Sequence, residues 1–205
     1  MKNQDTNTIT QHTLDDHGGG LLTALRFAIP IFLLTGLIYP AIATFTGGLV
    51  AGDKALGSLI YRDGKAVGST LIGQLFVGNS YFHGRPSAAK YDPMATAGSN
   101  LAPSNPALRE RASADSAKVQ ASESVVAAAI PVDLISASGS GLDPDISPAA
   151  AILQVRRVAL ARGLNEAVVG NLVKQHIESL TLGIFGQPRV NILLLNLALD
   201  ELKDR

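Results

Sequence analysis

The sequence predicts an α+β protein in which one N-terminal transmembrane helix precedes a small α+β domain. Three observations support this fold class. The 26 residues Phe27–Gly52 include no charged side chain. Beyond them, short β-prone runs are separated by turn residues. Ala-rich runs in the same region begin with helix-capping residues followed by proline, which is typical of helix starts.

The uncharged stretch is long enough to cross a membrane. As a helix it would measure roughly 39 Å at about 1.5 Å per residue, and a bilayer core of about 30 Å needs only about 20 residues. We therefore assign residues 25–50 to a transmembrane helix and residues 1–24 to a disordered polar tail. Prolines and glycines would kink or loosen this helix, which neighbouring membrane helices can compensate. The residues that mark the span are Leu25, Pro30, Gly36, Pro40 and Phe45.

A cleaved signal peptide is the alternative interpretation of this stretch, because Ala41–Ala43 has the small–x–small form of a cleavage site. The mature protein would then begin near Thr44. Whether secreted or anchored, the remaining domain would act as a solute-binding module. The polar stretch before the apolar run favours the anchor, because it is long and is not basic.

Composition and motif searches exclude several function classes. The 17 Lys and Arg residues balance 17 Asp and Glu residues, so the basic excess expected of a nucleic-acid-binding protein is missing. The absence of cysteine excludes disulfides, zinc–thiolate sites, iron–sulfur clusters and cysteine nucleophiles. The sequence contains no phosphate-binding P-loop, no dinucleotide-binding glycine motif, no nucleophile elbow and no H-E-x-x-H metal motif. No class of enzyme is therefore indicated.

The segment after the span predicts a hairpin, a loop and a helix. Asp63-Gly64 lies between two β-prone runs, and glycine accepts the positive φ of a tight turn. Residues 78–105 are rich in Gly, Pro, Asn and Ser, which predicts a long ordered loop. Asn105-Pro106 is typical of a helix start. We expect a helix over residues 107–129, broken near Ser122.

The C-terminal half predicts a short strand, two helices and a strand pair. Residues 131–135 are β-prone. A helix is expected over 148–162, and a second one is expected from Asn165 to about Glu178, each with a capping residue at its start. A strand pair is expected across residues 186–188, with its second strand over 190–195.

Three loop segments, residues 81–88, 91–106 and 137–144, have an unusual density of Gly, Pro, Asn, Asp and Ser. Turn chemistry explains such a composition, and the alternative is that these ordered loops carry function. Together with the motifs LIGQ, QVRRVA and PRVN, these segments resemble the C subunit of the Kdp-type potassium-transporting ATPase of bacteria. The resemblance covers roughly residues 26–200.

The resemblance implies an accessory subunit, not an enzyme, in a high-affinity ATP-driven potassium import complex. Its partners would be a channel-like potassium-binding subunit, a P-type pump subunit that hydrolyses ATP, and a small peptide subunit. The subunit would be needed for assembly and is proposed in this family to act as a catalytic chaperone that raises the ATP affinity of the pump subunit. Neither nucleic acid nor metal is implied, and no tightly bound cofactor. ATP would act through the complex, and potassium is the transported ion.

The resemblance also implies a single-pass protein of the cytoplasmic (inner) membrane, in contact with lipid. Residues 51–205 would form an extracytoplasmic domain on the outer (periplasmic) side. Arg26 supports this orientation, but basic residues soon after the span, Lys54, Arg62 and Lys65, nearly cancel the positive-inside signal. Because ATP is cytoplasmic, an outward domain would change ATP affinity only indirectly, through linkage.

Candidate subunit contacts lie in the first two loop segments: Tyr81, Phe82, Arg85, Asp92 and Asn100. Arg85 is the only charged residue between Lys65 and Lys90, and it has aromatic neighbours. An arginine in such surroundings is typical of an interface anchor. The alternative is an internal bond from Arg85 to loop carbonyl groups.

Overall fold

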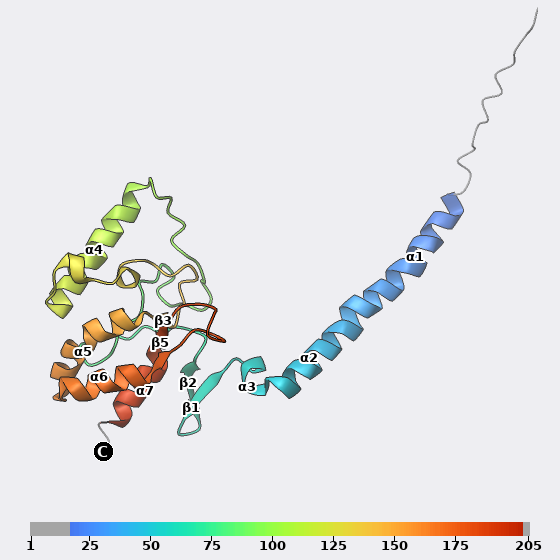
Figure 1. Ribbon diagram of the computed structural model, residues 1–205. Coiled ribbons are helices and arrows are strands. Elements are labelled where there is room, and N and C mark those ends of the chain that lie inside the picture. Colours follow the sequence, from blue (N-terminus) through green and yellow to red (C-terminus); the bar gives the residue numbers. More distant parts are fainter. Residues whose placement is uncertain (1–16, 203–205) are drawn as a thin grey trace, which may run out of the picture. The chain divides into compact units, whose positions relative to one another are not determined.

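The computed structural model describes residues 17–202, and side chains from Gly20 onward (Figure 1). The chain divides into two compact units, the first ending at Ala55 and the second beginning at Leu56. The first unit is helical in its described part, and the second contains helices and two small sheets. This confirms the predicted α+β class with one apolar N-terminal helix and a small helix-and-sheet domain.

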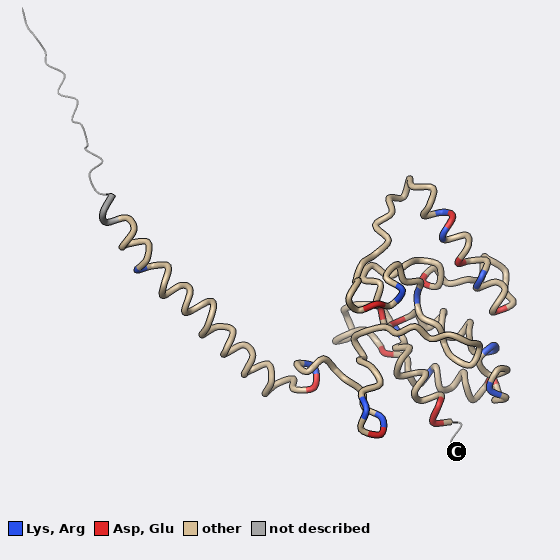
Figure 2. Tube along the Cα trace, turned by 180° about the vertical axis from the view of Figure 1, so that it is seen from behind, with Lys and Arg blue, Asp and Glu red and all other residues tan. Residues whose placement is uncertain are grey.

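The first unit contains one long apolar helix, formed by α1 (His17–Leu33), the π-helical turn η1 (Leu34–Ile38) and α2 (Tyr39–Val50). Its 31 residues Gly20–Val50 are long and apolar enough to cross a membrane. Figure 2 shows that this helix is almost free of charged residues. A short turn, α3 (Gly52–Ala55), follows it.

The helix starts earlier than expected and continues through both prolines. Residues 17–24, which we had assigned to the polar tail, are helical, and residues 1–16 lie outside the described part. Pro40 has no N–H to donate, and the π-helical turn ends two residues before it, at Ile38. There the Tyr39 N–H bonds the Leu34 carbonyl, five residues back. A local change of helix type thus accommodates Pro40 without ending the helix.

The second unit begins with the predicted hairpin, β1 (Leu59–Arg62) and β2 (Lys65–Ser69). Asp63 and Gly64 both have positive φ, 52° and 73°. This conformation matches the right-handed twist of the two strands and explains the Asp-Gly pair at the turn.

The second unit also contains a three-stranded antiparallel sheet with order β3-β5-β4. Its strands are β3 (Asp145–Ile146), β5 (Arg189–Asn191) and β4 (Ile177–Glu178). The helices are α4 (Pro106–Glu123), α5 (Pro148–Arg162), α6 (Glu166–Gln175) and α7 (Ile192–Glu201). Their apolar faces and the sheet enclose one core, which includes Phe82, Leu134, Ile146, Val158, Val173, Val190, Leu195 and Leu199.

The predicted helix starts are confirmed. Asn105, Ser147 and Asn165 are the N-caps of α4, α5 and α6, and each side chain accepts a backbone N–H of its helix. The first of these helices ends at Glu123, where Ser124 adopts a left-handed φ of 55°. This end agrees with the expected break near Ser122.

Two strand predictions are wrong. Residues 131–135 contain the 3₁₀ turn η3 (Val132–Leu134), which follows another, η2 (Ala127–Ala129). The expected strand 190–195 ends at Asn191, whose side chain caps α7. The buried positions after it, Ile192, Leu193, Leu195, Asn196 and Leu199, have helical spacing. The strand that precedes β5 in the chain and pairs with it is β4, and β3 pairs with the other edge of β5. The helix expected to reach Glu178 ends at Gln175.

Candidate functional site

Three loop segments meet in the second unit, namely 81–88, 91–106 and 137–144, the third of which is far from the first two in the sequence. Ser87 Oγ donates a hydrogen bond to the Gly141 carbonyl (2.6 Å), which joins the first loop to the third. Gly98 lies so close to the third loop that a Cβ there would be 2.7 Å from the Gly139 carbonyl oxygen. The composition that the sequence singled out therefore serves close packing between loops.

Arg85 joins the first loop to the third. Its Nη1 atom is 2.8 Å from Asp143 Oδ2, and its Nη2 atom donates to the Ser136 carbonyl (3.3 Å). The Nε atom is buried and has no hydrogen-bond partner among the described residues. Of the two roles considered for Arg85, the internal bond to the loops is present in the structure.

Phe82 and His83 lie in an extended segment whose backbone bonds to side-chain amides. Asn196 Oδ1 accepts the Phe82 N–H (2.9 Å), and its Nδ2 donates to the Phe82 carbonyl (3.0 Å). Gln154 makes the same pair of bonds with His83: its Oε1 accepts the His83 N–H (2.8 Å), and its Nε2 donates to the His83 carbonyl (3.1 Å). Buried backbone groups need such partners. The two amides therefore hold this segment against α7 and α5 as a strand neighbour would.

A buried ion pair lies next to the segment that contains Phe82 and His83. Arg157 Nε is 2.7 Å from Glu123 Oε1, and the two side chains are only 6% and 3% exposed. Arg157 also donates to the carbonyls of Asn79 and Tyr81, at 2.8 and 2.9 Å, and to Gln154 Oε1 at 2.7 Å. One guanidinium thus links α4 and α5 to the start of the first loop and the residues just before it.

Tyr81 packs beneath a second arginine. The Arg162 guanidinium lies 4.8 Å from the centre of the Tyr81 ring, and its Nη2 is 2.7 Å from Asp200 Oδ1. Arg162 Nε also donates to the Ser80 carbonyl at 2.6 Å. Tyr81 is therefore fixed between α5 and α7 by a cation–π contact and its surrounding bonds.

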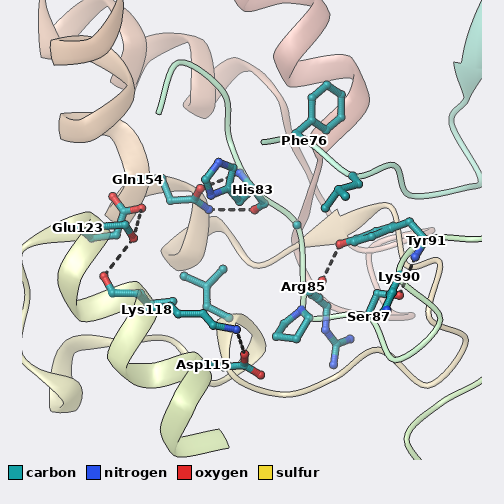
Figure 3. Close-up of a pocket in the computed structure, with 16 residues that line it drawn as sticks. Phe76, His83, Arg85, Ser87, Lys90, Tyr91, Asp115, Lys118, Glu123 and Gln154 are labelled. Atoms are coloured by element: carbon teal, nitrogen blue, oxygen red, sulfur yellow. Dashed lines mark hydrogen bonds and ion pairs between the residues drawn. The ribbon is translucent and has the colours of Figure 1, made fainter. Parts of the chain in front are cut away.

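A cavity of about 530 Å³ opens between the first loop, α4 and α5. Figure 3 shows Gln154 and Glu123 at one end of it and Arg85, Lys90 and Tyr91 at the other. Its apolar lining is Leu75, Phe76, Pro86, Val119 and Leu134. Glu123 Oε2 is buried there and no described group bonds it. The cavity therefore combines an apolar wall with cations at one end and a buried carboxylate at the other.

Burial shifts two titratable groups on the cavity wall. It lowers the pKa of His83 below its usual 6.5, which the Arg157 charge lowers further, whereas the bond to the Gly78 carbonyl raises it. Burial, aided by the negative charge of Asp143, raises the pKa of Tyr91 to about 12. The Tyr91 hydroxyl donates to the Arg85 carbonyl. Both groups are therefore neutral at pH 7.

The other predicted contacts lie in different surroundings. Phe82 is completely buried, so it is a core residue and its expected role as a surface contact is corrected. Asp92 and Asn100 are exposed. Asp92 Oδ1 accepts the Met94 N–H (2.8 Å), and Asn100 has a left-handed φ of 50°. Leu25 and Phe45, which mark the span, have exposed side chains in the first unit.

Sequence reasoning missed the polar residues that hold the loops. Gln154, Arg157 and Asn196 are buried on helices whose neighbouring positions are apolar. A signal was present, because a polar side chain on an apolar helix face must find a buried partner. The identity of that partner depends on the tertiary fold.

The chain is similar to known proteins over almost its whole length. Residues 21–201 match the family described as "K+-transporting ATPase, c chain". The Potassium-transporting ATPase KdpC subunit of Shewanella putrefaciens is 55% identical over 196 residues, which cover 96% of this chain and 97% of the relative. The proteins of the same name from Sorangium cellulosum and Ralstonia nicotianae are 51% and 48% identical. These matches cover 88% and 97% of this chain and 98% and 99% of the relatives.

Proposed function

The chain belongs to the KdpC family of K+-transporting ATPase subunits, and from this we propose that it is a non-catalytic accessory subunit of an ATP-driven potassium importer. In this role it assembles with a channel-like subunit, a P-type pump subunit and a small peptide subunit. The observation that carries the proposal is the match over residues 21–201, which includes both the apolar helix and the loops.

The arrangement of charged groups supports a docking role. Arg85, Arg157 and Arg162 each pair with an acidic residue of the same unit and bond backbone carbonyls. Side chains tied in this way fix the shape of loops, which is what a recognition surface needs. We propose that Arg85, Asp92 and Asn100 present the loop surface to the channel-like subunit, with Arg85 acting partly through the shape it maintains.

We propose that this chain changes the ATP affinity of the pump subunit indirectly. We propose that the N-terminal helix anchors the chain in the cytoplasmic membrane and that the second unit faces outward. An outward domain acts on cytoplasmic ATP by favouring the pump conformation that binds ATP, and the coupling between two such sites is reciprocal. The chain therefore raises ATP affinity without a nucleotide site of its own.

Deletion of the gene for this chain tests the proposal. Cells without it should fail to grow at micromolar potassium, and a plasmid copy should restore growth. The pump and channel subunits should co-purify with the tagged chain, and complex that lacks it should show a raised KM for ATP. Normal growth of the deletion strain, or purification of the chain alone, would contradict an accessory role.

The docking role of Arg85 has a matched control in Asp143. Arg85→Ala and Asp143→Ala break the same ion pair. Each also removes a bond of its own, from Arg85 to the Ser136 carbonyl and from the Asp145 N–H to Asp143. A purely internal role therefore predicts that complex yield falls in proportion to melting temperature in both variants. We expect Arg85→Ala to lose more complex at equal stability. Asn100→Gly, which keeps the left-handed backbone, should lower the yield at unchanged melting temperature. Yields that follow stability alone would refute the docking role.

A further inference from the structure

An exposed apolar turn projects from the second unit between β4 and β5. Residues 179–188 carry no charge, and the side chains of Leu182, Ile184 and Phe185 are 84%, 75% and 62% exposed. Three large apolar side chains at one tight turn are unusual on a surface that meets only water.

The backbone of this turn bonds to itself. The Thr181 and Phe185 N–H groups each donate to the other residue's carbonyl, at 2.8 and 3.0 Å. The Gly183 and Ile184 N–H groups donate to the Leu180 and Thr181 carbonyls, at 3.1 and 3.2 Å. Unsatisfied backbone groups are what prevents irregular segments from entering an apolar phase. This turn therefore leaves water at a lower cost than an open loop would.

The base of the turn carries paired charges. Arg189 is 2.7 Å from Glu178 and 3.1 Å from Asp145. Burial raises the pKa of Asp145 even though Arg189 opposes the shift. An apolar tip above a charged base is the arrangement expected at the boundary between acyl chains and headgroups.

The turn lies on the side of the unit where the chain enters. Ser69 Oγ donates to the Gly57 carbonyl (2.6 Å), and Asn191 Nδ2 donates to the Thr70 carbonyl (2.9 Å). These bonds join the first residues of the unit to β5, into which the turn leads. Figures 1 and 2 both show the turn at the same edge of the unit as the start of β1.

The short connection after the apolar helix limits how far Gly57 can lie from the end of that helix. The chain from Val50 to Gly57 spans at most about 25 Å even when fully extended. Leu56 and Leu71, the sequence neighbours of Gly57 and Thr70, also have exposed side chains. From the tether, the self-bonded backbone and the apolar tip, we propose that residues 181–185 insert into the lipid interface as a second membrane contact.

This inference rests on the N-terminal helix crossing a membrane but not on potassium transport. The chain contains no tryptophan, so one substitution supplies a unique fluorophore. We propose Phe185→Trp in the full chain, reconstituted in phosphatidylethanolamine–phosphatidylglycerol vesicles with and without brominated acyl chains. Val126→Trp provides an exposed control. It follows α4, which Figures 1 and 2 place across the unit from β1. Phe45→Trp provides a control within the span.

We expect brominated lipid to quench Phe185→Trp at least about twofold more than Val126→Trp, because interfacial apolar side chains reach the acyl boundary. Ile184→Trp should behave as Phe185→Trp does, which guards against misfolding of one variant. Quenching of Phe45→Trp without quenching of either turn variant would overturn the insertion while the anchor stands. Absence of quenching in all variants would overturn the anchor too. Loss of quenching in the assembled complex would show that protein, not lipid, covers the turn.

Discussion

Side chains of Gln154 and Asn196 complete the hydrogen bonding of a segment that has no neighbouring strand. Each amide both accepts from and donates to one residue of the segment. Arg157 donates hydrogen bonds to the carbonyls of Asn79 and Tyr81. Leaving one of these buried groups unpaired would cost about 1–3 kcal/mol. The position of the first loop therefore depends on a few polar side chains on α5 and α7.

Arg156 and Arg157 offer a matched pair of substitutions on one helix. Arg157 is buried against Glu123, whereas Arg156 is exposed. We expect Arg157→Ala to lower the free energy of unfolding by about 3–5 kcal/mol, because it leaves a buried carboxylate unpaired. Arg156→Ala should stay within about 0.5 kcal/mol of the parent. Urea unfolding of the full chain in detergent measures both. Similar values for the two variants would contradict the structural role of the ion pair.

His83 makes stability depend on pH. Its pKa is lowered in the folded protein from 6.5, so the unfolded chain binds more protons just below pH 6.5. Stability therefore falls as the pH drops through 6.5 toward the folded pKa. We expect His83→Asn to flatten this part of a plot of melting temperature against pH. A parallel plot for His83→Asn and the parent would show that His83 does not titrate as stated.

Sequence alone predicts contacts that lie within a few residues and misses those that depend on the fold. The caps Asn105, Ser147 and Asn165 bond residues two or three positions ahead, so local pattern suffices to find them. Arg85 pairs with Asp143, 58 residues away. Composition marked both loops as unusual, but nothing local shows that they meet.

At the scale of elements, short apolar runs are ambiguous. The run Ile192–Leu195 was expected to be a strand and forms the start of α7 instead. A run of this length is compatible with the two-residue period of a strand and with the 3.6-residue period of a helix. Asn191 decides the outcome, because its side chain accepts the Leu194 N–H as an N-cap. The hairpin was predictable because Asp63-Gly64 specifies its turn directly.

Substitution by alanine should change the free energy of unfolding in opposite directions at two glycines, one before α6 and one inside it. Gly163 ends α5 with a left-handed φ of 66°, so Gly163→Ala should destabilise the protein by about 1 kcal/mol. Gly170 is inside α6, and a Cβ there would lie 3.9 Å from Val155 Cγ1, an ordinary contact. Gly170→Ala should therefore stabilise the protein by about 0.5–1 kcal/mol. Thermal unfolding of both variants gives the signs. The same sign for both would refute this account.

At the scale of the whole molecule, the apolar helix separates two environments. The described part of that helix carries exposed apolar side chains throughout, and such a surface requires lipid or another membrane helix around it. The second unit has its own core and its own sheets. Length and charge were enough to predict the helix. They do not fix its direction, because Arg26 on one flank is offset by Lys54 on the other.

A pair of reporter fusions determines the direction. We expect alkaline phosphatase joined after Arg205 to be active and green fluorescent protein at the same position to be dark. Phosphatase folds only outside the cytoplasm, and the green fluorescent protein fluoresces only inside it. Truncation after Val50, with each reporter joined there, is the control that reports the direction of the span alone. If the fusions after Val50 give the same result as those after Arg205, the chain crosses the membrane once and the second unit lies on the side that the fusions report. Fluorescent green fluorescent protein and inactive phosphatase at both positions would place this unit in the cytoplasm. The direct contact with ATP that the outward placement forbids would then become possible.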